Sequence, residues 1–199
     1  MRRRTASPTR ERFVDAAVAL VDAHGGASAV TLRDIAEEVG CSPPNAYNWF
    51  AGLDELLTAA LVRICEEFLE RLASAVPPGT GPRDAFVASV RTYVAFAVEH
   101  PGRLNAYHFE RLTMSLGPEA LAAGAAVGQT MAELLSRGTD PSLPSGAADE
   151  ITTVLHSYLI GRLADHITGR ALLEDRAGAV ETVVAETLRL HQVLAEGWA

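Results

Sequence analysis

The sequence has few of the features that mark secreted, membrane-spanning or metal-binding proteins. Its two cysteines, Cys41 and Cys65, are too isolated among 199 residues for a disulfide framework or a zinc-ligand motif. No apolar run has the roughly 18–20 residues that a membrane-spanning helix needs. The opening Met1–Arg4 continues into polar residues instead of an apolar stretch, so we expect no secretory signal and a cytoplasmic protein.

Lysine is absent as well, and all 17 basic residues are arginine, which indicates a coding bias. The net charge of −8 at first sight disfavours nucleic acid, but it is unevenly distributed. Residues 1–53 hold six arginines and six acidic residues, so the whole negative excess lies in residues 54–199. A basic arm on a neutral head suits a protein that offers one end to DNA. The arginines of this arm are Arg2, Arg3, Arg4, Arg10 and Arg12.

Catalytic patterns are also lacking. The six histidines form no HExxH motif, and the sequence has no paired-carboxylate repeat, glycine-rich phosphate loop or serine nucleophile elbow. Asp165 and His166 are adjacent, so they point in different directions on a helix. An enzyme is therefore the least favoured class, and we expect no catalytic residue, no cofactor and no metal ion.

What the sequence does contain is helical periodicity along almost its whole length. Apolar residues recur at spacings of three and four, and proline or glycine residues separate the periodic segments. No segment alternates strictly, so no sheet is needed and the predicted fold class is all-α. The pattern predicts an N-terminal helix ending at Gly25-Gly26, a helix from Leu53 to Pro77, a short helix after Pro101, and helices over 31–39, 43–50, 83–99, 118–137, 147–169 and 175–196.

The segment 31–53 is the most informative part of the chain. The first of its two short predicted helices, 31–39, begins with Thr31 and has Asp34 three residues on, which predicts a near capping box. Only Gly40-Cys41-Ser42 separates it from the second helix, 43–50, and this connection forces the sharp angle of a helix-turn-helix motif. In that motif the second helix lies in the DNA major groove, with its N-terminal residues facing base edges. Here this helix carries polar or amphipathic side chains where a core helix would carry leucine or valine. The alternative interpretation is a helix hairpin that merely packs.

The same residues resemble the DNA-binding head of the TetR family of repressors. Residues 31–50 match the pattern T-x-x-x-I-A-x-x-x-G-x-S-x-x-x-x-Y-x-x-F at each fixed position, and Leu53-Asp54-Glu55-Leu56-Leu57 follows. The resemblance covers roughly residues 10–60. Beyond it only length and helical plan agree, apart from His100-Pro101-Gly102, which resembles one subgroup of the family. The residues that resemble the family's first helix are Phe13, Ala16, Ala17, Leu20 and Gly25.

The resemblance implies a role for each residue of the motif. Thr31 would cap the second helix and touch a phosphate, and Ser42 would cap the recognition helix so that its N–H groups face phosphate. Tyr47 and Trp49 would lie against the DNA backbone, whereas Arg33 would reach a phosphate or a base. The candidates for the groove floor, where asparagine bonds adenine and proline contacts a thymine methyl, are Pro44, Asn45 and Asn48. The predicted DNA-binding residues are Thr31, Arg33, Ser42, Pro43, Pro44, Asn45, Tyr47, Asn48 and Trp49.

Leu53 departs from the family pattern, which usually has a phosphate-binding lysine three residues after the phenylalanine. The loss of one phosphate contact should weaken DNA binding and reduce its salt dependence by about one ion. The arm of Arg2–Arg4 would compensate by entering an adjacent minor groove or by screening phosphates.

The last two predicted helices are unusually apolar for the end of a chain. Their apolar positions cover more than one narrow stripe, which suits packing against the body and against a second subunit at once. Two ordinary core helices are the alternative. We therefore favour a homodimer, whose two recognition helices must lie about 34–36 Å apart, or a multiple of that distance, to reach successive major grooves. The predicted domains are a helix-turn-helix DNA-binding domain, 1–52, and a helical ligand-binding and dimerisation domain, 53–199.

A regulator of this type couples a ligand in its body to the spacing of two heads, so that the ligand releases operator DNA by linkage. We expect repression relieved by a small, largely apolar effector. Each candidate pocket residue taken singly is better explained as core filler or surface, and only the set indicates an apolar pocket with a few polar anchors. The candidates are Tyr93, Phe96, Tyr107, His108, Arg111, Met114, His156 and Tyr158. A helical small-molecule carrier with a vestigial head is a further alternative, which Arg33, Asn45 and Asn48 disfavour.

Overall fold

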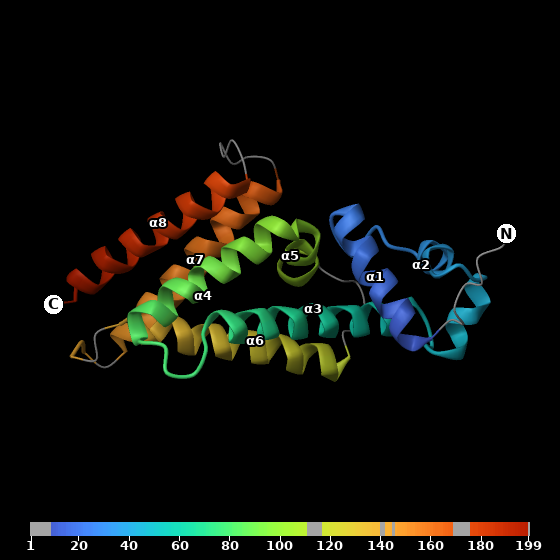
Figure 1. The fold of residues 1–199 in the computed structure, drawn as a ribbon, viewed down its shortest axis with the longest axis horizontal. Coiled ribbons are helices and arrows are strands. Elements are labelled where there is room, and N and C mark those ends of the chain that lie inside the picture. The colour runs from blue at the N-terminus through green and yellow to red at the C-terminus, as the bar shows by residue number, and fades with distance from the viewer. Residues whose placement is uncertain (1–8, 111–116, 140–141, 145, 169–175, 199) are drawn as a thin grey trace. The chain divides into compact units, whose positions relative to one another are not determined.

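The computed structural model describes residues 9–110, 117–139, 142–144, 146–168 and 176–198. Within these ranges every regular element is helical and no strand occurs, which confirms the all-α prediction. Figure 1 shows the helices in chain order. They are α1 (Arg10–His24), α2 (Leu32–Val39), the 3₁₀-helix η1 (Pro43–Asn48), α3 (Leu53–Ala75), α4 (Pro82–Glu99), α5 (Pro101–His108), α6 (Pro118–Arg137), α7 (Ala147–Ile167) and α8 (Arg176–Glu196).

The chain forms two compact units. Unit 1 consists of Met1–Glu67 and His100–Ala125, and unit 2 consists of Phe68–Glu99 and Ala126–Ala199. Helices α3 and α6 continue from one unit into the other. Compactness therefore divides the chain differently from the predicted functional boundary between residues 52 and 53, which stays a prediction.

The core of unit 1 forms where α1 packs on α2 and on α5 (Figure 1). Helix α1 begins after Thr9, whose hydroxyl accepts the Arg12 N–H at 3.4 Å, and it ends at Gly25, which adopts a left-handed φ of 74°. Phe13 and Ile35 are completely buried. Burial of side chains of this size stabilises the unit by about 1.5–3 kcal/mol each, so the packing of α1 on α2 holds the head together.

Unit 2 has its core between α4, α7 and α8, which pack against one another (Figure 1). Leu155, Leu159 and Leu163 recur every four residues on the inner face of α7 and are 0–1% exposed. Among the polar contacts between α7 and α8, Glu186 accepts hydrogen bonds from the Tyr158 hydroxyl at 2.7 Å and from Arg162 Nε at 2.9 Å. No helix in the described ranges is both long and apolar enough to cross a bilayer.

Candidate DNA-binding site

Helix α2 has a complete N-terminal cap. The Thr31 hydroxyl accepts the Asp34 N–H at 3.2 Å and donates to the Asp34 carboxylate at 2.6 Å, while the Thr31 N–H donates to the same carboxylate at 3.2 Å. This is the capping box that the sequence predicts, and it holds the pKa of Asp34 below its usual value. Because the hydroxyl proton of Thr31 goes to Asp34, a phosphate contact by Thr31 would require that proton to change partner.

The turn after α2 has the predicted sharp geometry. Gly40 adopts φ 80°, a left-handed conformation that costs other L-residues energy, and its N–H donates to the Glu37 carbonyl at 3.0 Å. The Cys41 N–H then reaches back to the Ala36 carbonyl at 2.9 Å. These turn contacts end α2, so that a second helix can begin after Ser42. Cys41 and Cys65 are both free thiols.

The recognition helix differs from the prediction. The sequence predicts a helix over 43–50 capped by Ser42, but the structure has the 3₁₀-helix η1, which ends at Asn48, and Ser42 makes no capping hydrogen bond. Pro43 and Pro44 carry no N–H, so the first donor is that of Asn45, and it already binds the Ser42 carbonyl at 3.0 Å. The predicted role of free N–H groups at this helix start in facing phosphate therefore does not hold.

Two buried side chains, one within η1 and one just after it, anchor this helix to the core. Ala46 is 1% exposed, and Phe50 is 3% exposed and packs edge-on against Phe13 with ring centroids 6.3 Å apart. The intervening residues point outward, with Tyr47 61% and Trp49 44% exposed and Asn48 exposed as well. The short helix thus lies on the surface of the protein. The helix-turn-helix interpretation requires this exposure.

The two asparagines of η1 are not equivalent. The Asn45 side chain is half-buried, and its amide nitrogen donates to the Ser42 hydroxyl at 3.3 Å. The Asn48 side chain is exposed and makes no hydrogen bond within the described part of the chain. Asn48 is therefore better prepared than Asn45 to bond a base edge. The remaining predicted residues of this surface, Thr31, Arg33, Ser42, Pro43 and Pro44, are all exposed.

The predicted basic arm is shorter than its arginine content indicates. Arg10 and Arg12 belong to α1, where the Arg10 guanidinium lies 5.1 Å from the centroid of the Phe50 ring and Arg12 Nη2 donates to the Val39 carbonyl at 2.9 Å. Both cations thus support the head itself, Arg12 by satisfying a carbonyl at the end of α2. The rest of the arm, Arg2–Arg4, lies outside the described residues.

The start of α3 is not a phosphate site in this structure. Leu53 is half-buried, and the Ala51 N–H before the helix donates to the Glu55 carboxylate at 2.6 Å. On the same helix Arg63 pairs with Glu11 and, at 2.9 Å, with Asp15 of α1. A single positive charge from outside the head is thereby shared by two of its six acidic residues, which reduces repulsion of DNA.

Comparison of the sequence and the fold with known proteins identifies the family of this chain. No protein-family model matches the chain. The chain is 32% identical over 162 residues, 79% of its own length and 71% of the relative, to the uncharacterised HTH-type transcriptional regulator Rv0681 of Mycobacterium tuberculosis. It is 26% identical to the HTH-type transcriptional repressor KstR of Rhodococcus jostii over 88% of this chain and 80% of that protein. A tetR-family regulator from Streptomyces coelicolor shares the fold with a TM-score of 0.72 at 22% identity, over 94% of this chain and 82% of that one.

The chain belongs to the TetR family of transcriptional regulators. Its relatives are DNA-binding regulators and not enzymes, in agreement with the lack of catalytic patterns in the sequence. No cluster of three or more histidine, cysteine, aspartate or glutamate side chains in the described ranges is arranged to hold a metal ion.

The predicted effector residues of this TetR-family chain are divided between its two units. In unit 2, Tyr93 and Phe96 are 5% and 7% exposed and pack edge-on against Phe68, with ring centroids 5.8 and 5.2 Å away. The Tyr158 hydroxyl binds Glu186, and His156 is exposed.

In unit 1 the Tyr107 ring meets the half-buried His108 edge-on at 4.4 Å, and its hydroxyl donates to the Gly124 carbonyl at 3.0 Å. Burial raises the pKa of Tyr107. Arg111 and Met114 lie outside the described residues. The contacts of Tyr93 and Phe96 with Phe68 favour core packing for these two residues. The effector pocket itself stays a prediction.

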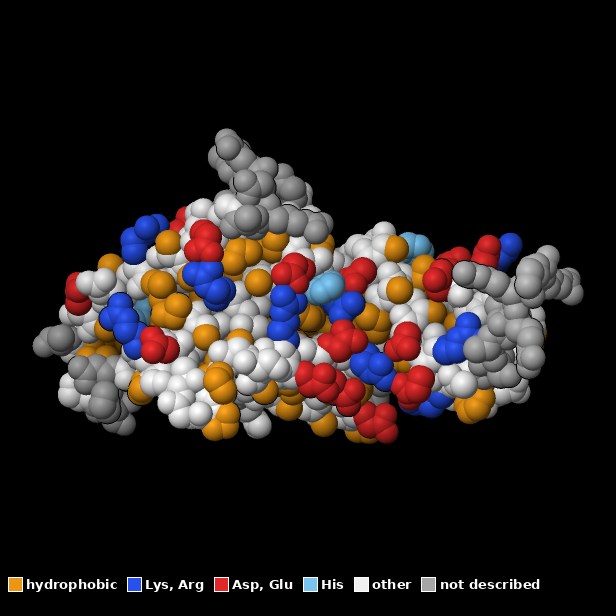
Figure 2. Space-filling view, viewed as in Figure 1, with side chains coloured by type: hydrophobic (Ala, Val, Ile, Leu, Met, Phe, Trp, Pro, Cys, Tyr) orange, Lys and Arg blue, Asp and Glu red, His pale blue; other side chains and the backbone are white. Residues whose placement is uncertain are grey.

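Helix α5 carries functional candidates that sequence reasoning missed. Arg103 is nearly buried and pairs with Glu67 of α3 and, through Nε at 2.9 Å, with Asp22 of α1. His100 Nδ1 lies 3.2 Å from the same Asp22 carboxylate. Figure 2 shows charged side chains of both signs gathered over α1, α3 and α5. The His100-Pro101-Gly102 motif was the available sequence signal, but it does not reveal the partners.

Two further contacts fix α5 against the end of α1. A Cβ on Gly102 would lie only 2.2 Å from the Val21 carbonyl oxygen, so only glycine permits this close approach. Beyond the helix, the Glu110 carboxylate accepts the backbone N–H groups of Ala27 and Ser28 at 2.6 and 3.0 Å. The loop that leads into α2 is thereby tied to α5, and a shift of α5 would reach the DNA-binding head.

Proposed function

We propose that this chain is a ligand-responsive repressor that binds operator DNA as a homodimer and is released by a small, largely apolar effector. The observation that carries the proposal is the exposed edge of η1, where Tyr47, Asn48 and Trp49 project from a helix anchored by buried Ala46 and Phe50. Surface aromatic residues beside an asparagine are poorly explained by folding, because burying them would stabilise the head more.

These side chains supply complementary contacts to a duplex. The Tyr47 hydroxyl and the Trp49 indole N–H are donors suited to phosphate oxygens, whereas the Asn48 amide offers the donor and acceptor pair that fits adenine N7 and N6 in the major groove. The exposed Arg33 on α2 adds a cation to the same motif. The surface thus combines backbone positioning with base recognition.

Binding to a promoter fragment from its own gene region tests this assignment. Asn48→Ala should weaken cognate binding by about 1–3 kcal/mol in fluorescence anisotropy and leave binding to random DNA nearly unchanged. The matched control is Gln129→Ala, which removes another exposed side-chain amide from α6 in unit 2 and should change neither affinity. Equal losses on cognate and random DNA would exclude base recognition by Asn48, and unaltered binding of both would exclude Asn48 from the interface.

The dimer part of the proposal rests on α7 and α8, whose outer faces keep apolar side chains in solvent. Val193 is 64% exposed, Val154 is 37% exposed, and Trp198 just beyond α8 is 40% exposed. Hydrophobic atoms also reach the surface between charged side chains along α4 and α8 in Figure 2. Such a face is typical of a surface that a second subunit covers.

A charge placed on α8 tests the dimer. Val193→Glu should shift the mass measured by light scattering from two chains to one and should weaken operator binding, since a single head has half of the contacts. Leu121→Glu, at a leucine of α6 that is 60% exposed, is the control and should stay dimeric. A wild-type monomer, or a dimer that tolerates Val193→Glu, would contradict this assignment.

Effector release would act through α5. Its ion pair with Asp22, and the two backbone hydrogen bonds that Glu110 just after the helix accepts, link it to the head. A ligand that binds better to a state with α5 displaced lowers DNA affinity by the same factor by which DNA lowers ligand affinity. Arg103→Gln should therefore reduce the effect of any effector on DNA binding more than it reduces effector binding itself.

A further inference from the structure

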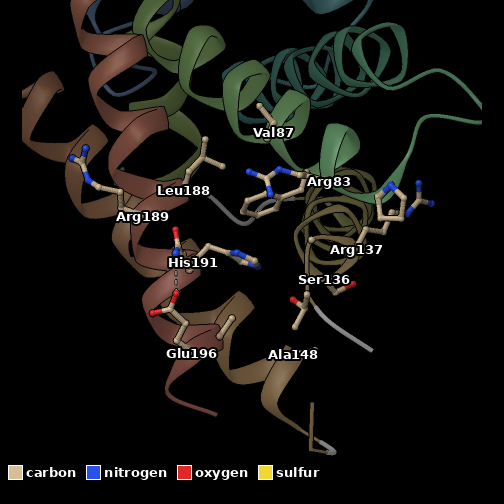
Figure 3. Close-up of a pocket in the computed structure, with 15 residues that line it drawn as sticks. Arg83, Val87, Ser136, Arg137, Ala148, Leu188, Arg189, His191 and Glu196 are labelled. Carbon is tan, nitrogen blue, oxygen red and sulfur yellow. Dashed lines mark hydrogen bonds between the residues drawn. The ribbon is translucent and has the colours of Figure 1, made fainter. Parts of the chain in front are cut away.

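Unit 2 contains an open groove that none of the predicted pocket residues lines. Its volume is about 1110 Å³, and it lies between the first turns of α4, the end of α6, the start of α7 and the last turns of α8 (Figure 3). The floor and walls include the apolar side chains of Phe86, Val87 and Leu188. A groove of this size holds a small organic molecule.

The cations that line this groove differ from the other arginines of unit 2 whose side chains the structure describes. Arg71, Arg91 and Arg162 each pair with a glutamate. Arg83 and Arg137 line the groove and form no ion pair within the described residues. The acidic side chain among the described lining residues is Glu196, which accepts a hydrogen bond from Gln192 at 2.8 Å. Arg189 also lines the groove, but Figure 3 shows its side chain pointing away from the other labelled residues. The groove therefore has an excess of positive charge that is not neutralised from within.

Two polar atoms of the groove are buried without a partner. Thr139 is 91% buried, and neither its hydroxyl oxygen nor His191 Nε2 finds a hydrogen-bond partner among the described residues. An unsatisfied buried polar group destabilises the folded protein, so such groups mark places where a ligand or water is expected. Figure 3 shows the His191 ring reaching from α8 into the groove, and this ring packs on Phe86 with centroids 4.6 Å apart.

The surroundings of His191 also determine its protonation state. Burial and the nearby Arg83 lower the pKa of His191, so the imidazole is neutral at neutral pH and offers Nε2 as either a donor or an acceptor. A neutral ring can donate its Nε2–H to a carboxylate, while the exposed Arg83 nearby supplies the positive charge.

We infer that this groove binds an amphiphilic carboxylate. Its head would accept hydrogen bonds from the Thr139 hydroxyl and from His191 Nε2–H beside the Arg83 guanidinium, and its apolar body would cover Phe86, Val87 and Leu188. The binding site stands on its own, and only the role of this ligand as the effector rests on the function proposed above. An inorganic anion would leave the apolar walls uncovered, and a neutral lipid would leave the cations unpaired.

Decanoate, decanol and acetate separate these possibilities when their binding to the DNA-free protein is measured by calorimetry. Decanoate should bind most tightly, because only it satisfies both the cations and the apolar walls. Arg83→Gln should weaken decanoate binding about tenfold, the size of one charge-assisted hydrogen bond, and leave decanol unchanged. Arg91→Gln, on the exposed side of the same helix, is the matched control and should leave both unchanged.

A blocking variant tests the location. Ala195→Trp fills the groove from α8 and should abolish decanoate binding while its circular dichroism and melting temperature stay close to wild type. The inference is overturned if decanol binds as tightly as decanoate, if Arg83→Gln and Arg91→Gln have equal effects, or if Ala195→Trp still binds decanoate. Because these measurements need no DNA, a failure of operator binding would refute the proposed function and leave the groove intact.

Discussion

The two helices of the helix-turn-helix motif are built on opposite plans. Helix α2 has a capping box at its start, a left-handed glycine at its end, and three buried residues, Ile35, Ala36 and Val39, on one face. Helix η1 has no side-chain cap, one buried residue within its bounds, Ala46, and a 3₁₀ geometry with poorer hydrogen bonds. Helix α2 is stabilised by its own caps and buried face. Helix η1 is held in place by the packing of Ala46 and Phe50.

This difference shows how a small head can expose a recognition surface. Because α2 and the Phe13–Phe50 contact supply the stability, η1 is free to carry side chains chosen for contact with another molecule. Substitutions in α2 should therefore act on folding, and substitutions in η1 should act on DNA affinity. The following variants test that separation.

The largest effect is expected at the centre of α2. Ile35→Ala removes a completely buried side chain and should lower the free energy of unfolding by about 2–5 kcal/mol, because it leaves a cavity. Urea denaturation of the full chain measures it, and Ile35→Val should cost only about 0.5–1.5 kcal/mol. A loss for Ile35→Ala below that of Ile35→Val would show that α2 is not the stable partner.

A smaller effect of the other kind is expected in η1. Tyr47→Phe removes one hydroxyl and should weaken binding to any DNA by about 1.5–3 kcal/mol if the hydroxyl donates to a phosphate. Stability should stay within about 0.5 kcal/mol, because the side chain is mostly exposed. Parallel titrations with cognate and random duplexes provide the measurement, and a stability loss without an affinity loss would reverse the assignment.

The capping box should contribute less than the core. Thr31→Ala should destabilise the head by about 1 kcal/mol at neutral pH, and Thr31→Ser should restore most of it. The pKa of Asp34 lies below its usual 3.8, chiefly because the Thr31 hydroxyl donates to it. Ionised Asp34 therefore stabilises the fold fully at pH values above the usual pKa of 3.8. This stabilisation is lost as the pH falls through the lowered pKa of the folded protein. The gap between the stabilities of wild type and Thr31→Ala should narrow in acid, and a constant gap would exclude the linkage.

The smallest effect is expected just after the motif. Leu53→Lys places a cation where the family usually has one, and it should steepen the dependence of log affinity on log salt by about one ion. Ala60 and Leu61 on the buried face of α3 stay in place, so folding should change little. Anisotropy titrations at several salt concentrations decide it, and an unaltered slope would mean that residue 53 does not face phosphate.

Much of the head could be predicted from its sequence. The Thr31–Asp34 capping box, the turn at Gly40 and the outward direction of Tyr47, Asn48 and Trp49 all depend on residues within a few positions of one another. The length of the recognition helix was predicted wrongly, because Pro43 and Pro44 remove donors and favour the tighter 3₁₀ turn. The availability of Arg10 and Arg12 was also misjudged, since their partners Phe50 and Val39 lie 40 and 27 positions away.

The sequence by itself determined the all-α class, the helix boundaries to within a few residues and the position of the DNA-binding motif, because periodicity, caps and turns act over short stretches of chain. Only the tertiary structure decided that α5 is tied to α1 and that Arg83, Thr139 and His191 share a groove. Arg103 and Asp22 are 81 positions apart. Contacts over such separations depend on how whole helices pack, and local sequence patterns do not encode which partner a side chain meets.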